Sequence, residues 1–142
     1  MQVSKLVLVS EICSHITHMQ GECVRVLGRI SEFDIDSSFV VLAHASFDIL
    51  VDTNLIGPID KNTSKALIQF VGEMTEADDL TNMSPMVREY LQQTRRVGMP
   101  LRSFVYLNAR IVRNMDGLDV SLYENSLKAM RIFDQRRSDL EF

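Results

Sequence analysis

The chain has 142 residues, of which 46% are hydrophobic and 24% are charged, and its formal net charge at pH 7 is -4. This length and composition favour one packed domain and exclude a disordered or fibrous chain, and no apolar run approaches the roughly 18 residues of a membrane span. The acidic balance argues against strong independent binding to nucleic acid, because phosphate is repelled at long range.

The first residues contain one lysine and a short apolar run without the features of a secretory signal, so a soluble intracellular protein is expected. Four residues of zinc-ligand type follow, namely Cys13, His15, His18 and Cys23. Their spacing matches no zinc module, so we expect two ordinary histidines and two small thiols in a loop or strand, with metal binding as the alternative. Two cysteines are too few to staple such a domain and are expected to stay reduced, with a disulfide as the alternative. No cofactor is expected.

Five strands are predicted from period-two alternation and from runs of β-branched and aromatic residues. They span residues 23–33, 39–44, 47–52, 66–74 and 103–112. In the first strand Val24, Val26 and Ile30 share one face, and Gly28 suits a point where the strand coils around a small barrel. Only residues 45–46 separate the second and third strands, a spacing that predicts an antiparallel hairpin.

The connection between the fourth and fifth strands contains an insertion at about residues 76–101 with its own helical passage. Ser84 before Pro85 is a good helix start, because proline fits the first helical position. Met86 and Tyr90 then recur at helical spacing. A connection of this length is uncommon in a compact domain unless it has a function or is a tolerated excursion, and a tolerated excursion is the interpretation we favour.

The last element is a helix over about residues 121–137. Ser121 and Glu124 form a capping-box pattern, in which the serine hydroxyl takes a backbone amide and the glutamate reaches back. Five short strands, a helical insertion and this helix predict a five-stranded OB-fold β-barrel with a C-terminal α-helix, built as a single domain over residues 1–142.

The apolar arc of the terminal helix is wider than one contact with its own barrel requires. Two stripes make up this arc, one of Leu122, Ala129 and Phe133, the other of Tyr123, Leu127 and Met130. One stripe can pack on the barrel and the other on a partner protein. We predict that the partner is contacted by Tyr123, Leu127 and Met130 as anchors, with Lys128 and Arg131 at the rim. The alternative for the same residues is packing across the open end of their own barrel.

The sequence contains no phosphate-cradling glycine loop, nucleophile elbow or metalloprotease motif, so an enzyme is not expected. Single-stranded nucleic acid is the usual ligand of an OB fold, held by stacked aromatics and basic loops. Phe33, Phe39 and Phe47 could offer stacking faces, although we favour core positions for them. A direct single-strand binder is therefore a second hypothesis. Its candidate contacts to the nucleic-acid backbone are Arg25, Arg95 and Arg96.

Several stretches together resemble the smallest, OB-fold subunit of the CST telomere-capping complex. They are LVSEI (8–12), VLGRI (26–30), ILVDTNL (49–55), FVGE (70–73) and, most specifically, ARIVRNMDGLDVSLYENSL (109–127). The resemblance spans most of the chain outside the insertion. It departs at Ser121, where related chains often have a proline, and serine preserves a helix-start signal by other means.

The resemblance implies a non-catalytic subunit that binds the OB domain of a second, Stn-one-like subunit and, through it, a larger CST subunit. It also implies a place in the nucleus at telomeres, with single-stranded telomeric DNA bound weakly or through the complex, and no membrane partner. The small subunit of replication protein A has the same plan of barrel plus helix and remains the competing identification. A structural OB adaptor in an unrelated assembly is a third alternative.

Overall fold

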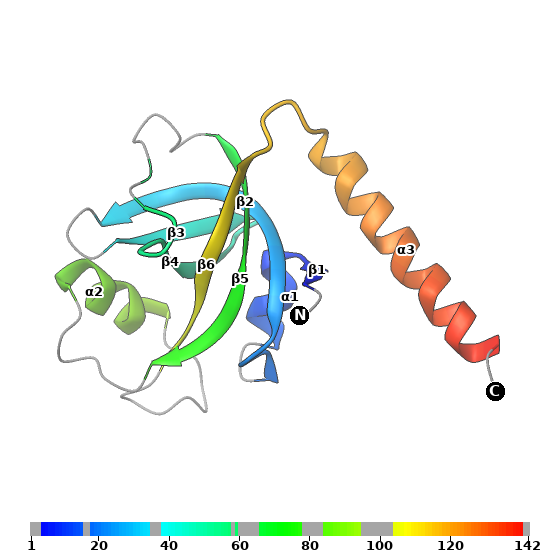
Figure 1. The fold of residues 1–142 in the computed structure, drawn as a ribbon, viewed down its shortest axis with the longest axis horizontal. Helices are drawn as coiled ribbons and strands as arrows, with labels where there is room; N and C mark the ends of the chain where they lie inside the picture. Colours follow the sequence, from blue (N-terminus) through cyan, green and yellow to red (C-terminus); the bar gives the residue numbers. More distant parts are fainter. Residues whose placement is uncertain are drawn as a thin grey trace.

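The structure is a computed structural model that describes residues 4–15, 18–34, 38–57, 59, 66–77, 84–94 and 104–140. Within these residues the elements follow one another as β1 (Lys5–Val7), α1 (Val9–Ser14), β2 (Cys23–Asp34), β3 (Phe39–His44), β4 (Phe47–Asp52), β5 (Leu67–Ala77), α2 (Pro85–Thr94), β6 (Phe104–Asn114) and α3 (Val120–Leu140) (Figure 1).

Strands β2 to β6 form a closed barrel. The sheet order is β1-β2-β3-β4-β6-β5, and an additional pairing of β2 with β5 closes the ring. Neighbouring barrel strands are antiparallel except β4 and β6, which pair in parallel over Val51 and Asp52. The predicted five-stranded OB-fold barrel with a helical insertion and a terminal helix is confirmed.

The barrel interior is filled by the alternate residues of each strand. Val26, Leu42 and Phe70 are among the side chains with no exposed surface. Gly72 lies where the pairing of β5 with β6 shifts by one residue, and a Cβ atom there would lie 2.1 Å from the backbone oxygen of Asn108. Only glycine allows the two strands to approach this closely, which keeps the small barrel closed.

The segment before the barrel differs from the prediction of a loop or strand. Strand β1 pairs in parallel with β2, and the helix α1 follows it directly. The backbone amide of Leu8 donates to Glu11 Oε1 at 2.9 Å, which caps the start of α1. The helix buries Val9 and Ile12 in the barrel core. A six-residue helix covers less than two turns, so its periodicity was too short to identify from the sequence.

The start of α3 also differs from the prediction. The helix begins at Val120, one residue before the predicted start, and Asp119 rather than Ser121 caps it. Asp119 Oδ1 accepts a hydrogen bond from the amide of Leu122 at 3.1 Å, and the Asp119 carbonyl accepts one from the amide of Tyr123. Aspartate is as good an N-cap residue as serine. Asp119 is the cap because it directly precedes the first helical residue, whereas Ser121 lies inside the helix.

Cys13 and Cys23 are not joined in a disulfide, and the Sγ of Cys13 donates to the backbone oxygen of Asp48 at 3.2 Å. Among the described residues no group of three or more His, Cys, Asp or Glu side chains is arranged to hold a metal ion. None of the described helices is both long and apolar enough to cross a membrane. The hairpin between β3 and β4 turns through Ala45 and Ser46, both with positive φ.

Candidate partner-binding surface

Helix α3 lies over the outer face of β2 and β5. Leu27, Leu67 and Gln69 alternate away from the barrel interior, yet they are only 2%, 2% and 6% exposed. Val120 at the start of α3 lines a hollow with Leu67, and the side chain of Tyr123 interacts with that of Gln69. The outer face of this strand pair is therefore covered by the terminal helix.

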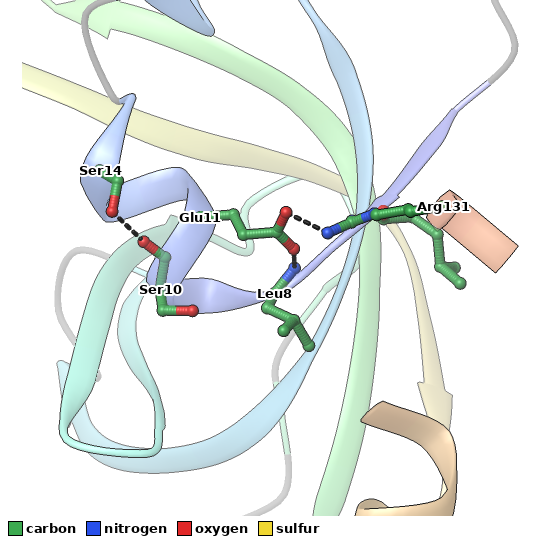
Figure 2. A network of polar contacts seen from close by, with 6 residues as sticks. Leu8, Ser10, Glu11, Ser14 and Arg131 are labelled. Carbon is green, nitrogen blue, oxygen red and sulfur yellow. Dashed lines mark hydrogen bonds and ion pairs between the residues drawn. The ribbon is translucent and has the colours of Figure 1, made fainter. Parts of the chain in front are cut away.

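Polar contacts of two residues, Glu124 and Arg131, fix α3 along its length. Near its start, Glu124 Oε1 lies 2.5 Å from His44 Nε2 at the end of β3. Further along, the guanidinium of Arg131 donates to the Glu11 carboxylate and to the backbone oxygen of Leu6, the latter at 2.6 Å. Figure 2 shows Glu11 between Leu8 and Arg131, so one carboxylate caps α1 and also binds α3. The Arg131–Glu11 pair is about a third exposed, with side-chain exposures of 36% and 34%, so it orients the helix more than it stabilises it.

The stripe of α3 that faces the barrel contains Tyr123, Leu127 and Arg131. Leu127 is 3% exposed, although it belongs to a helix on the molecular surface. Burial raises the pKa of Tyr123, and the charges of Arg131 and Arg25 partly oppose this shift. The Tyr123 hydroxyl is buried without a hydrogen bond of good geometry in the described part of the chain.

The opposite stripe of α3 is apolar and faces solvent. Its large side chains are Leu122, Met130, Ile132 and Phe133, which are 63%, 56%, 54% and 66% exposed. In Figure 1 none of the described helices and strands lies on the side of α3 that faces away from the barrel. Soluble proteins rarely expose several large apolar side chains on one face of a helix unless that face binds something.

The structure divides the predicted partner contacts between the two faces of the helix. Tyr123, Leu127 and Arg131 lie on the side of α3 that contacts the chain's own barrel, whereas Met130 and Lys128 are exposed. The Leu122 stripe, which would then have been the inner one, faces outward. Helical periodicity gives the angle between two stripes but does not say which of them faces the barrel. Here the contacts of Arg131 with residues far away in the sequence decide which stripe faces the barrel.

Of the three candidate nucleic-acid contacts, only Arg25 lies among the described residues. Arg25 is exposed on β2, and its Nε donates to Ser4 Oγ at 2.5 Å. Arg95 and Arg96 lie outside the described residues. The three phenylalanines also differ from one another: Phe33 packs partly buried against the core, Phe39 is 7% exposed and Phe47 is 43% exposed.

A family model described as a telomere-capping CST complex subunit matches residues 1–137. No curated protein matches the sequence.

Three solved structures are similar in fold. A chain of the S. pombe Stn1-Ten1 complex aligns with a TM-score of 0.61 and 14% identity, covering 92% of this chain and 93% of that one. The telomere capping protein Ten1 from Saccharomyces pombe aligns with 0.59 and 14%, covering 91% and 98%. Replication protein A of U. maydis, bound to single-stranded DNA, gives 0.56 and 12%, covering 95% of each chain. At these identities the structural likenesses establish the fold alone.

Proposed function

The chain belongs to the family of telomere-capping CST complex subunits, and we propose that it is a non-catalytic subunit that pairs with a second OB-fold protein through α3. The observation that carries this proposal is the exposed apolar strip of α3. In this proposal the partner resembles Stn1, which is named beside Ten1 in the S. pombe complex. The pair would act in the nucleus at telomeres and hold single-stranded DNA as part of the larger complex.

The energetics of the outward strip support a stable pair. Burying a side chain such as Leu122, Met130 or Phe133 contributes about 1.5 to 3 kcal/mol before ordering costs are subtracted. Because α3 is already fixed on the barrel by Leu127 and Arg131, little further ordering is needed when the partner binds. A pre-ordered helix with an apolar face is the kind of surface that a partner helix or groove accepts.

The residues named from the sequence have two different roles in this proposal. Met130 is a direct contact and Lys128 lies at the rim of the interface. Tyr123, Leu127 and Arg131 act indirectly, because they hold α3 in the orientation that presents its outer strip. Leu122 and Phe133 take the places of the other direct anchors, since their side chains are the most exposed of the large apolar groups on α3.

Co-expression with an Stn1-like OB-fold subunit tests the proposal. We expect the double variant Leu122→Ala, Phe133→Ala to lose co-purification with the partner while its own unfolding transition stays unchanged. The matched control is the double variant Phe47→Ala, Leu55→Ala, which removes two exposed apolar side chains outside α3. Undiminished pairing of the double variant would reject the outer strip as the interface.

The same co-expression experiment, with a different partner, tests the competing identification of the chain as a subunit of a replication-protein-A-like trimer. The fold likeness to the U. maydis protein does not separate the two, whereas the family match favours CST. A candidate partner of each class, co-expressed with the chain in competition, would identify which one is retained.

A further inference from the structure

A second helix covers a different outer face of the barrel. Phe39, Val41 and Leu50 point outward from β3 and β4 and form an apolar cluster with Val87 of α2, which has no exposed surface. Tyr106 of β6 packs at the edge of this cluster, with its ring 5.5 Å from that of Phe39 in an edge-to-face arrangement. The insertion between β5 and β6 thus places a helix on the barrel wall.

Polar contacts fix α2 at both ends of residues 84–90, the part of this segment whose side chains the structure describes. Ser84, just before the helix, donates to the Asp34 carboxylate at the end of β2. The Ser84 hydroxyl also accepts from the amide of Val87 at 3.4 Å. One turn later, the Tyr90 hydroxyl donates to Asp48 Oδ1 at 2.6 Å. Hydrogen bonds to carboxylates are stronger than neutral ones, so the helix is held in a defined register over β3 and β4.

The position of α2 matters because OB folds bind oligonucleotides on one particular face. That face is formed by the second and third barrel strands, here β3 and β4, and is bordered by the connections between strands one and two and between strands four and five. In this chain the first connection begins after Asp34, and the second one supplies α2 itself. The helix therefore occupies the place where bases would stack on Phe39 and Tyr106.

Three carboxylates also lie around this face. Asp34 is the last residue of β2, and Asp48 and Asp52 belong to β4. Asp34 accepts a hydrogen bond from Ser84, and Asp48 accepts one from Tyr90 of α2. Burial, and after it the Asp52 carboxylate, raises the pKa of Tyr106. A single-stranded nucleic acid needs a positively charged groove for its backbone, and these carboxylates would repel it.

We infer that the outer face of β3 and β4 is a helix-binding face, occupied by α2 of the same chain, and that single-stranded DNA is excluded from it. This assignment is independent of the pairing proposed for α3, which uses the outer face of β2 and β5. It gives the insertion a specific role. It also implies that any DNA contact of this subunit in the assembled complex uses other surfaces.

Photo-crosslinking of the full chain, alone and with its partner, tests the exclusion directly. Single-stranded DNA carrying 5-iodouracil would be irradiated with the protein, and the crosslinked residues would be identified by mass spectrometry. We expect no crosslink to Phe39, Tyr90 or Tyr106. A crosslink to any of the three would overturn the inference, because aromatic rings within stacking distance of a base react readily.

Release of α2 provides the second test. Val87→Asp introduces a charge into the apolar cluster, whereas Pro85→Asp adds the same charge at an exposed position two residues away. We expect the first variant, and not the second, to raise the rate of proteolysis within residues 84–94 about tenfold. Unchanged protection would show that Val87 does not anchor the helix and would overturn the assignment.

The DNA affinity of the Val87→Asp protein distinguishes two cases. Either the β3–β4 face cannot bind nucleic acid at all, or it can bind nucleic acid and α2 covers it. Because Asp34, Asp48 and Asp52 remain, we expect Kd for a single strand to change by less than about twofold. Tightening by about fivefold or more would show that α2 hides a functional DNA site, which contradicts the inference. Co-purification with the partner should be unaffected, so failure of the α3 proposal would be seen separately. If this variant does not fold, the crosslinking of the unmodified chain decides.

Discussion

Helices α2 and α3 both cover an outer face of the same barrel, but they use their apolar surface differently. The buried side of α2 inserts Val87 between outward residues of β3 and β4, and none of its described side chains is a strongly exposed large apolar group. Helix α3 buries Leu127 and leaves Leu122, Met130 and Phe133 in solvent. The contrast indicates that α2 completes the chain's own fold, whereas α3 leaves large apolar side chains uncovered, as the proposed pairing requires.

The largest effect is expected at the inner anchor of α3. Leu127→Ala removes a buried side chain and should lower the free energy of unfolding by about 2 to 4 kcal/mol, with a cavity left under the helix. Chemical denaturation measures the loss, and hydrogen exchange of the α3 amides should show the helix opening before the barrel. A change below about 0.5 kcal/mol would mean that α3 is not packed on the barrel in solution.

At the anchor of α2 a smaller effect is expected. Val87→Ala removes two methyl groups from a compact cluster and should cost about 1 to 2 kcal/mol. Hydrogen exchange should accelerate in α2 and leave α3 unchanged, because the two helices cover different strands. Equal acceleration in both helices would contradict the division of the outer surface into two independent faces.

Tyr123→Phe should be nearly neutral at pH 7, since the buried hydroxyl gains no well-formed hydrogen bond. At high pH the two proteins should differ. Burial raises the folded pKa of Tyr123 above its ordinary value of 10.0, so ionisation favours the unfolded chain. The contribution of the neutral tyrosine is present below pH 10 and is lost as pH rises above it. Urea titrations at pH 8 and pH 11 should therefore show less alkaline destabilisation for the variant than for the unmodified chain.

The smallest effect on the isolated chain is expected at the outer strip of α3. Leu122→Ala and Phe133→Ala each remove an exposed side chain and should change the unfolding free energy by less than about 0.5 kcal/mol. Thermal melts of the purified chain test this expectation. A marked destabilisation would show that the strip contributes to the chain's own fold, and the contrast between α2 and α3 would then disappear.

Much of the barrel was predictable because its patterns are local. The bounds predicted for β3 and β4 agree with the structure to the residue, and α2 begins at the predicted proline. The alternation of apolar residues and the two-residue separation at 45–46 together predict a hairpin without knowledge of the rest of the fold. Helix α1 escaped prediction because it has only six residues.

The direction of α3 could not be predicted for a different reason. Tyr123 and Leu122 are adjacent in the sequence and similarly apolar, so the periodic pattern assigns both to a contact surface without ranking them. The choice depends on Arg131, which reaches Leu6 and Glu11 about 120 residues earlier in the chain. Glu11 belongs to α1, a helix that the sequence pattern did not predict, so this long-range contact was not available to the sequence analysis.

The β3–β4 hairpin offers a way to strengthen the protein without altering either helix. Ala45 and Ser46 both adopt left-handed backbone conformations, with φ of 50° and 70°, which side chains with a Cβ atom disfavour. Asn-Gly at these two positions suits such a turn and should raise the melting temperature. Because both residues are exposed, a thermostabilised chain made in this way would retain its interaction surfaces and would be a better starting material for reconstituting the complex.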